Sequence, residues 1–369
     1  MKLNRGYKFR IYPNEEQRIL LSKTFGCVRK VWNLMLSDRI SEYERTKDSA
    51  KKMKHPTPAQ YKTEFTFLKE VDSLALANAQ LNLDKAYRNF FRDKTIGFPK
   101  WKSKKNPVKS YTTNSVNGNI SLEGNQLKLP KLGKVKVKAH RSIPDDYRLK
   151  SVTISQSASG KYYASILCEY DEEVIASKIQ SAVGLDFSMS ELYISSEGDS
   201  PQYPRFYRRA QEKLARMQRV LSKMRQGSNN YYKQKKKIAS YHEYIANCRK
   251  DFLHKQSKQI TNAFDLVAIE NLNMKGMSQA LHFGKSVSDN GWGMFVSFLS
   301  YKLSDRGKRL IKVDKWFPSS KICSVCGAKK EELSLSERVY TCDCGNMLHR
   351  DVNAAINIRD EAIRMLATT

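Results

Sequence analysis

The sequence has no long hydrophobic run. No stretch of its 369 residues approaches the roughly 20 consecutive apolar residues that a membrane-spanning helix requires. The opening segment, Met1-Lys2-Leu3-Asn4-Arg5, is not followed by the apolar core of a signal peptide. A basic amphipathic terminal helix and a lipidation motif are missing too. We therefore expect a soluble intracellular protein without a membrane partner.

Acidic residues are also scarce. The chain has 37 Asp and Glu against 66 Lys and Arg, a formal net charge of +29. Hydrophobic residues make up 40% and aromatic residues 10%, which is enough to build cores and excludes wholesale disorder. The length predicts two or three domains, because one core rarely grows past roughly 250–300 residues. The positive excess predicts a polyanionic partner, and nucleic acid is favoured over an anionic membrane.

Cysteine is sparse except in one segment. Cys27, Cys168 and Cys248 stand alone, as is typical of reduced, buried thiols. The other four form two knuckles near the C-terminus, Cys323-x-x-Cys326 and Cys342-x-Cys344, in a spacing that resembles a structural zinc ribbon. The second knuckle is one residue shorter than usual, which strains a tetrahedral site. His349 as a substitute ligand and a thiol cluster without metal remain alternatives.

The first half of the chain changes from helical to strand periodicity. Residues 3–11 alternate as a half-buried strand, and Asn14 with Gln17 predicts a helix N-cap. Apolar residues then recur at helical spacing in two helices, separated by a basic loop at 47–58. From 111 to 170 the period becomes two, with turn signals between short strands. We expect a small β-barrel, completed by the strand at 3–11, with the helical module inserted in it.

The second half combines apolar strands with a strongly basic segment. Strands are expected at 182–187, 191–196, 265–270 and 309–313, and a helix at 351–366. Residues 205–258 hold 16 Lys and Arg against three acids, a local net charge of +13, and favour a helical pair broken at 227–230.

Three carboxylates stand out in this half. Asp186 and Glu270 lie in or at the end of apolar strands, and Asp351 lies in the first turn of the last helix. Burying an unpaired carboxylate costs several kcal/mol, so such acids are paired or hold a metal. Three of them suit a two-metal phosphodiesterase site with Mg²⁺ or Mn²⁺. The alternative is that Asp186 caps a turn, Glu270 pairs with a lysine, and Asp351 only complements the helix dipole.

The chain resembles the TnpB family, the transposon-encoded RNA-guided DNA nucleases related to the ancestors of Cas12. Besides the cysteine knuckles, the resemblance rests on motifs that follow one another along the whole chain: Tyr7-Lys8-Phe9-Arg10-Ile11-Tyr12-Pro13, Tyr87-Arg88-Asn89-Phe90-Phe91, Gly97-Phe98-Pro99-Lys100, Leu127-Lys128-Leu129-Pro130-Lys131-Leu132-Gly133, Gly184-Leu185-Asp186, Ile269-Glu270-Asn271-Leu272, Gly291-Trp292, Phe317-Pro318-Ser319-Ser320 and Arg350-Asp351-Val352-Asn353-Ala354-Ala355. Family members often have an Asp-Arg-Asp sequence where this chain has His349-Arg350-Asp351, although the last acid is kept.

The resemblance implies a multidomain α+β protein. Its parts would be a wedge β-barrel (1–12 and 106–180), a helical recognition lobe (13–105), an RNase H-like RuvC nuclease domain (181–314 and 346–369) and a zinc-ribbon insertion (315–345). Asp186, Glu270 and Asp351 would be the catalytic acids and the magnesium ligands, and Cys323, Cys326, Cys342 and Cys344 the zinc ligands. The protein would bind a guide RNA from its transposon end, one protein per RNA. It would cut both strands of a target DNA next to a short adjacent motif, in a prokaryotic, nucleoid-associated setting.

In such a protein the target DNA sequence is selected by base pairing with the guide RNA. The protein chain therefore mainly needs contacts to the nucleic-acid backbones. The adjacent motif would be recognised by residues 73–80 and 114–119. The candidate contact residues are Tyr7, Arg10, Lys100, Trp101, Lys102, Lys104, Lys105, Asn117, Arg205, Arg208, Arg209, Lys235, Lys236 and Lys237. For any single lysine the alternative is a solvated side chain, and for Trp101 and Tyr111 it is core packing. An RNA-guided DNA-binding repressor and a transposase are the alternative functions.

Overall fold

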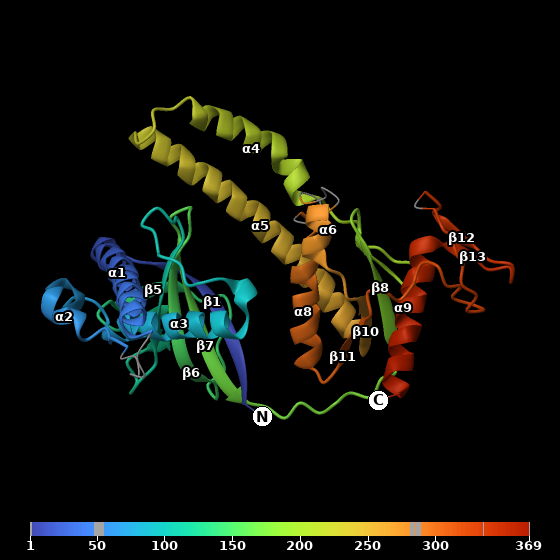
Figure 1. Cartoon of the computed structure of the whole chain (residues 1–369), viewed down its shortest axis with the longest axis horizontal. Coiled ribbons are helices and arrows are strands. Elements are labelled where there is room, and N and C mark those ends of the chain that lie inside the picture. The colour runs from blue at the N-terminus through green and yellow to red at the C-terminus, as the bar shows by residue number, and fades with distance from the viewer. Residues whose placement is uncertain (1, 48–54, 281–283, 285–288, 335, 369) are drawn as a thin grey trace. The chain divides into compact units, whose positions relative to one another are not determined.

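The computed structural model divides into two compact units, Met1–Glu172 and Glu173–Thr369, which we call the N-terminal and C-terminal units (Figure 1). The residues described are 2–47, 55–280, 284, 289–334 and 336–368. Within these residues, no helix is long and apolar enough to cross a membrane.

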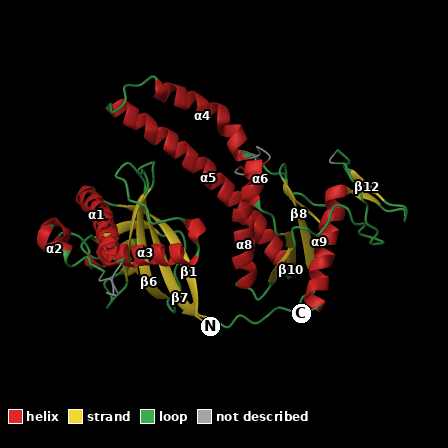
Figure 2. Ribbon diagram, viewed as in Figure 1, coloured by secondary structure: helices red, strands yellow, loops and turns green. Residues whose placement is uncertain are grey.

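The N-terminal unit is built on one antiparallel sheet, in which β6, β7 and β1 are labelled in Figure 2. The sheet has seven strands in the order β2-β6-β7-β1-β5-β4-β3. Its strands are β1 (Lys2–Tyr12), β2 (Lys109–Asn114), β3 (Ser121–Glu123), β4 (Gln126–Leu129), β5 (Gly133–Lys138), β6 (Arg148–Gln156) and β7 (Tyr162–Asp171). The end strands β2 and β3 do not pair with each other among the described residues. The expected barrel is therefore a half-barrel that the strand at 3–11 joins at its centre, between β7 and β5.

The alternation predicted for the first strand is confirmed. Tyr7, Phe9 and Ile11 are buried on one face of β1, and the residues between them lie on the other. Asn117 and Gly118 both have positive φ, +50° and +68°, in the turn after β2. Asparagine and glycine adopt this left-handed conformation more readily than other residues, which is why the pair is one of the turn signals between the predicted strands.

The helices of this unit follow β1 in the chain and pack on the sheet, sharing one hydrophobic core with it. They are α1 (Glu15–Thr46), α2 (Tyr61–Glu64), the 3₁₀ segments η1 (Thr66–Lys69) and η2 (Lys94–Ile96), and α3 (Ser73–Arg92). The predicted N-cap of α1 is present as a full capping box, because Asn14 and Gln17 each accept the other's backbone N–H. The expected loop at 47–58 lies largely outside the described residues.

The C-terminal unit contains a mixed sheet of four strands in the order β11-β10-β8-β9. The strands are β8 (Ala182–Ser188), β9 (Leu192–Ser195), β10 (Leu266–Glu270) and β11 (Arg309–Val313). β8, β10 and β11 are parallel, and β9 is antiparallel to β8. All four strands lie where the apolar runs predicted them.

Helices and a small hairpin complete this unit. They are α4 (Phe206–Ser222), α5 (Asn229–Ala263), α6 (Met274–Ala280), α8 (Trp292–Ser304), α9 (Arg350–Ala367) and the strands β12 (Val339–Thr341) and β13 (Met347–His349). The basic segment forms the expected helical pair: α4 and α5 pack on each other and extend beyond the sheet of their unit (Figure 1). Ser228 lies within the predicted break and caps α5 by accepting the Tyr231 N–H.

Candidate active site and cysteine cluster

Two of the predicted acids lie on neighbouring parallel strands. β8 pairs with β10 with Leu185 opposite Ile269, so the next residues along each strand are Asp186 and Glu270. Glu270 is the last residue of β10, at the carboxyl end where open α/β sheets place their sites. Both carboxylates are half-buried. The register of one strand pair therefore brings together two acids that are 84 residues apart in the sequence.

The third acid reaches the same sheet through close helix packing. Asp351 lies in the first turn of α9, and Ala355 and Arg359 follow at four-residue steps on the same helix face. That face lies against Gly184: a Cβ atom at position 184 would be 1.9 Å from the Ala355 carbonyl oxygen and 2.8 Å from the Arg359 nitrogen. A glycine on β8, two residues before Asp186, is therefore required for α9 to approach the sheet.

The electrostatics show that the three acids interact. Burial raises the pKa of Asp186 well above its ordinary value, and the charges of Glu270 and Asp351 raise it further. The Phe187 N–H and the Arg350 charge act in the opposite direction without cancelling this effect. Burial and the neighbouring charges both disfavour the ionised form of Asp186, and a bound cation would offset both effects.

Glu270 has one partner that sequence reasoning did not assign. Burial raises the pKa of Glu270, while the Ser319 hydroxyl, which donates to its Oε1 atom at 2.5 Å, lowers it. Ser319 belongs to the motif Phe317-Pro318-Ser319-Ser320, which had indicated only the family. Nothing in the local sequence pattern shows that this loop reaches the end of β10.

Two buried asparagines on α9 were also missed. Asn357 Nδ2 donates to the carbonyls of Ser319 and Ile322, both at 2.7 Å. Asn353 Nδ2 donates to Ile322 O at 2.7 Å, and its Oδ1 accepts the Ser324 N–H at 3.0 Å. The sequence feature that could have identified them is a pair of polar residues, four positions apart, on the buried face of an amphipathic helix.

The four predicted cysteines gather into one cluster. Their Sγ atoms all lie within 4.8 Å of one another, and the Cys323–Cys344 and Cys326–Cys342 sulfurs are 3.6 Å apart. A tetrahedral zinc site with Zn–S bonds of about 2.3 Å places its sulfurs about 3.8 Å apart, so the cluster fits structural zinc. Within the part of the chain that the structure describes, no other His, Cys, Asp or Glu residues form so close a group. His349, at the end of β13, is not part of it.

Tight turns allow the short second knuckle to reach the cluster. Gly345 has a φ of +87°, and the Cys342 N–H donates to Asn346 O at 2.9 Å. Asn346 Nδ2 in turn donates to Cys323 Sγ at 3.4 Å. Burial by itself raises the pKa of the Cys323 thiol, but backbone N–H groups of Cys326 and Val325 and the Asn346 amide outweigh it and lower that pKa to about 6. Cys323 therefore favours the thiolate, the form that binds metal, whereas contacts with the neighbouring thiols raise the pKa of Cys342 and Cys344.

The predicted nucleic-acid residues of the N-terminal unit differ in exposure. Tyr7 is only 4% exposed and packs against Phe9, so we do not include it in a binding surface; Tyr111, at 5%, is a core residue beside Phe25. Trp101 is 56% exposed. The candidates that also have exposed side chains are Lys100, Lys102, Lys104, Lys105 and Asn117.

Two of the basic candidates contact aromatic rings. The Arg10 guanidinium lies over the rings of Tyr12 and Tyr163, and the Lys102 ammonium lies 3.9 Å from the centre of the Trp32 ring. In the C-terminal unit the remaining candidates are all exposed on or just before α4 and α5: Arg205, Arg208, Arg209, Lys235, Lys236 and Lys237.

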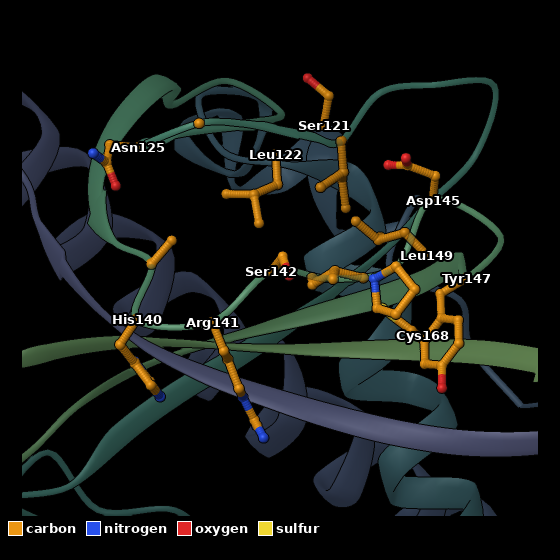
Figure 3. Close-up of a pocket in the computed structure, with 15 residues that line it drawn as sticks. Ser121, Leu122, Asn125, His140, Arg141, Ser142, Asp145, Tyr147, Leu149 and Cys168 are labelled. Atoms are coloured by element: carbon orange, nitrogen blue, oxygen red, sulfur yellow. The ribbon is translucent and has the colours of Figure 1, made fainter.

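A cavity of about 730 Å³ lies in the N-terminal unit, between the β3–β4 hairpin and the segment that follows β5 (Figure 3). Its lining includes His140, Arg141, Asp145 and Tyr147. The Arg141 guanidinium also lies over the Tyr7 ring, and Tyr147 stacks on Tyr170 at 4.2 Å. It contains none of the predicted acids or metal ligands, and the sequence analysis did not single it out.

Comparison with known proteins first defines the class. Family models match three segments: "Probable transposase" of the OrfB_IS605 type over residues 165–281, "Helix-turn-helix domain" of the same type over 1–48, and "Cas12f1-like, TNB domain" over 292–358. In fold, the chain matches a Cas12f1 solved as an sgRNA–target DNA complex, with a TM-score of 0.60 at 12% identity, covering 97% of this chain and 99% of that one. The class is that of the transposon OrfB proteins and their Cas12f1-like relatives.

Two relatives of similar length identify the family. A protein of Streptomyces pristinaespiralis is 35% identical over 97% of this chain and 89% of its own length. InsQ of Escherichia coli K12 is 31% identical, covering 97% of this chain and 92% of its own. Both bear the name "Putative RNA-guided DNA endonuclease". The chain belongs to the TnpB family, as its motifs predicted.

Proposed function

We propose that this chain is an RNA-guided double-strand DNA endonuclease with Asp186, Glu270 and Asp351 as its catalytic acids. The observation that supports this most directly is the convergence of the three carboxylates from β8, β10 and α9. The names of the two relatives support guidance by RNA and cleavage of DNA. The effect of the Glu270 and Asp351 charges on buried Asp186 supports one shared site over three separate structural roles.

The three acids fit hard divalent cations, Mg²⁺ or Mn²⁺, which prefer carboxylate oxygens. Such ions, when bound, supply an activated water and stabilise the leaving oxygen of phosphodiester hydrolysis. The chain's own residues hold and orient the ligands: β8 and β10 fix two of them in register, and the Gly184 contact fixes the third through α9.

We assign these elements to a RuvC-type nuclease domain formed by residues 181–314 and 346–369. Residues 315–345 would form its zinc ribbon. Cys323, Cys326, Cys342 and Cys344 would supply four thiolate ligands to a zinc ion, whose role would then be structural.

The exposed basic residues of α4 and α5 form the proposed surface for guide RNA and the heteroduplex, by contacts to phosphates. In the N-terminal unit, Trp101 and the lysines near it are a second candidate surface, because an exposed ring among cations can stack on a base.

The test is purification from cells that carry the native transposon end, sequencing of the bound RNA, and plasmid cleavage with Mg²⁺. Guide-dependent double-strand cuts by the wild type, lost in Asp186→Ala but kept in Glu197→Gln, support the proposal; Glu197 is an exposed acid of the same unit. A discrete RNA with binding but no cutting indicates a repressor instead. Strand transfer without a guide indicates a transposase.

A further inference from the structure

The Ser319 hydroxyl is placed as a fixed donor to one oxygen of Glu270. Ser319 lies in the loop after β11, is 5% exposed, and donates to Glu270 Oε1 at 2.5 Å. The carboxylate group of a glutamate can rotate, which exchanges the positions of its two oxygens, Oε1 and Oε2. The hydrogen bond from Ser319 to Oε1 restricts this rotation, and Oε2 does not take part in that bond.

The loop that carries Ser319 is itself held on α9. Asn357 binds the Ser319 carbonyl and the Ile322 carbonyl, and Asn353 binds Ile322 from one turn earlier in the helix. Both asparagine side chains are buried, at 6% and 0% exposure. Hydrogen bonds at these buried sites are costly to break, because a buried polar group that loses its partner cannot bond to water instead.

The same bonds continue into the first cysteine knuckle. The Ser324 N–H donates to Asn353 Oδ1, next to Cys323, whose sulfur belongs to the four-thiol cluster. α9 also begins with Asp351. The helix that contributes the third acid therefore also fixes the loop that orients the second acid, within one connected set of hydrogen bonds.

We propose that Ser319 is a positioning residue for Glu270, held by Asn357 and by the adjoining cysteine knuckle, so that the ribbon fixes the orientation of a metal-binding carboxylate. This inference rests on the proposed function. Hydrogen-bonding partners of metal ligands typically contribute 10–100-fold to metal affinity or activity. A role for Ser319 in stability alone would affect unfolding without affecting metal affinity.

The experiment measures Mn²⁺ affinity calorimetrically on the full, zinc-loaded chain, for the wild type, Ser319→Ala, Ser319→Thr, Asp186→Ala and Ser257→Ala. Ser257 is the matched control: it is fully buried in the same unit, and its hydroxyl donates to Leu253 O at 2.7 Å on α5. Zinc content and thermal unfolding are recorded for each variant. Cleavage is then measured against Mg²⁺ concentration with guide-loaded protein.

Ser319→Ala is expected to weaken Mn²⁺ binding about tenfold and to raise the Mg²⁺ concentration for half-maximal cleavage similarly, with the KM for DNA unchanged. Ser319→Thr, which keeps the hydroxyl, should restore most of the affinity, and Ser257→Ala should bind as the wild type does. If Asp186→Ala loses Mn²⁺ binding but Ser319→Ala does not, the positioning role is wrong while the proposed function stands. If Asp186→Ala also binds as the wild type does, the nuclease site itself is wrongly placed.

Discussion

Gly184 on β8 and Ala355 on α9 are in direct backbone contact. A methyl group at position 184 would lie 1.9 Å from the Ala355 carbonyl oxygen, closer than any two such atoms can approach. The helix therefore packs on the sheet at Gly184. Asp351, one helical turn before Ala355, is then near enough for its charge to raise the pKa of Asp186.

Gly184→Ala should displace α9 and separate Asp351 from the other two acids. We expect cleavage to be largely lost and stability to fall by about 1–3 kcal/mol, the usual cost of overpacking. Thermal unfolding and plasmid cleavage measure the two effects. Gly293→Ala is the control, because a Cβ atom there meets open space within α8. If Gly184→Ala cuts as well as the wild type, the contact does not position Asp351.

Removing any one of the three acids should abolish cutting and spare RNA binding. Asp186→Asn, Glu270→Gln and Asp351→Asn each keep the size of the side chain and remove its charge. We expect the single-turnover cleavage rate to fall by more than about 1,000-fold in each, with non-additive effects when two are combined, because the acids act as one unit. Guide-RNA affinity, measured by filter binding, should stay unchanged; residual cutting near the wild-type rate would remove that acid from the site.

Cys326→Ser should reduce the zinc content and destabilise the C-terminal unit. A four-sulfur site contributes to folding directly, and loss of one ligand opens it. We expect less than one zinc per chain by elemental analysis and a lower unfolding temperature. Cys248→Ser, on α5 and outside the cluster, is the control and should keep its zinc. Equal zinc content in both variants would contradict the ribbon assignment.

Asp265 should stabilise the fold only above acidic pH. The Gln180 N–H lowers the pKa of Asp265, and so does Lys308, 3.2 Å away. Because the folded-state pKa lies below the unfolded one, the stabilisation is complete above the unfolded value, near 3.8, and is lost as the pH falls through the folded value.

Asp265→Asn should therefore lower the unfolding temperature at pH 7, and its difference from the wild type should shrink as the pH falls through this acidic range. Thermal unfolding across pH tests this. A difference that is independent of pH would mean that the charge of Asp265 is not the cause.

Replacing Lys235, Lys236 and Lys237 together by glutamine should weaken guide-RNA binding and reduce its salt dependence. A plot of log affinity against log salt concentration has a negative slope, and each lost phosphate contact reduces the magnitude of that slope by about 0.7–0.9. Lys235, Lys236 and Lys237 are exposed on one turn of α5, and the three side chains point in different directions around the helix. Because they cannot all contact the same RNA strand, we expect the magnitude of the slope to fall by roughly one to two. The triple lysine-to-arginine variant keeps the charge and should keep the slope. An unchanged slope in the glutamine variant would place the RNA elsewhere.

The amino-acid sequence by itself determined the local elements and the residues with distinctive chemistry. The alternation of β1, the capping box at Asn14, the Asn117-Gly118 turn and the break before α5 depend on neighbouring residues, so short windows contain the information. The cysteine spacing predicted a cluster that the structure confirms, because two knuckles with glycines form largely local turns. The catalytic role of the acids stays a prediction.

Only the tertiary structure decided how these pieces meet. The half-barrel, the burial of Tyr7, the Gly184–Ala355 contact and the hydrogen bond from Ser319 to Glu270 each join segments far apart in the chain. Ser319 and Glu270 are 49 residues apart, and neither strand pattern nor residue type indicates that one approaches the other. Such contacts follow from strand register and helix packing over the whole unit, which no local pattern contains.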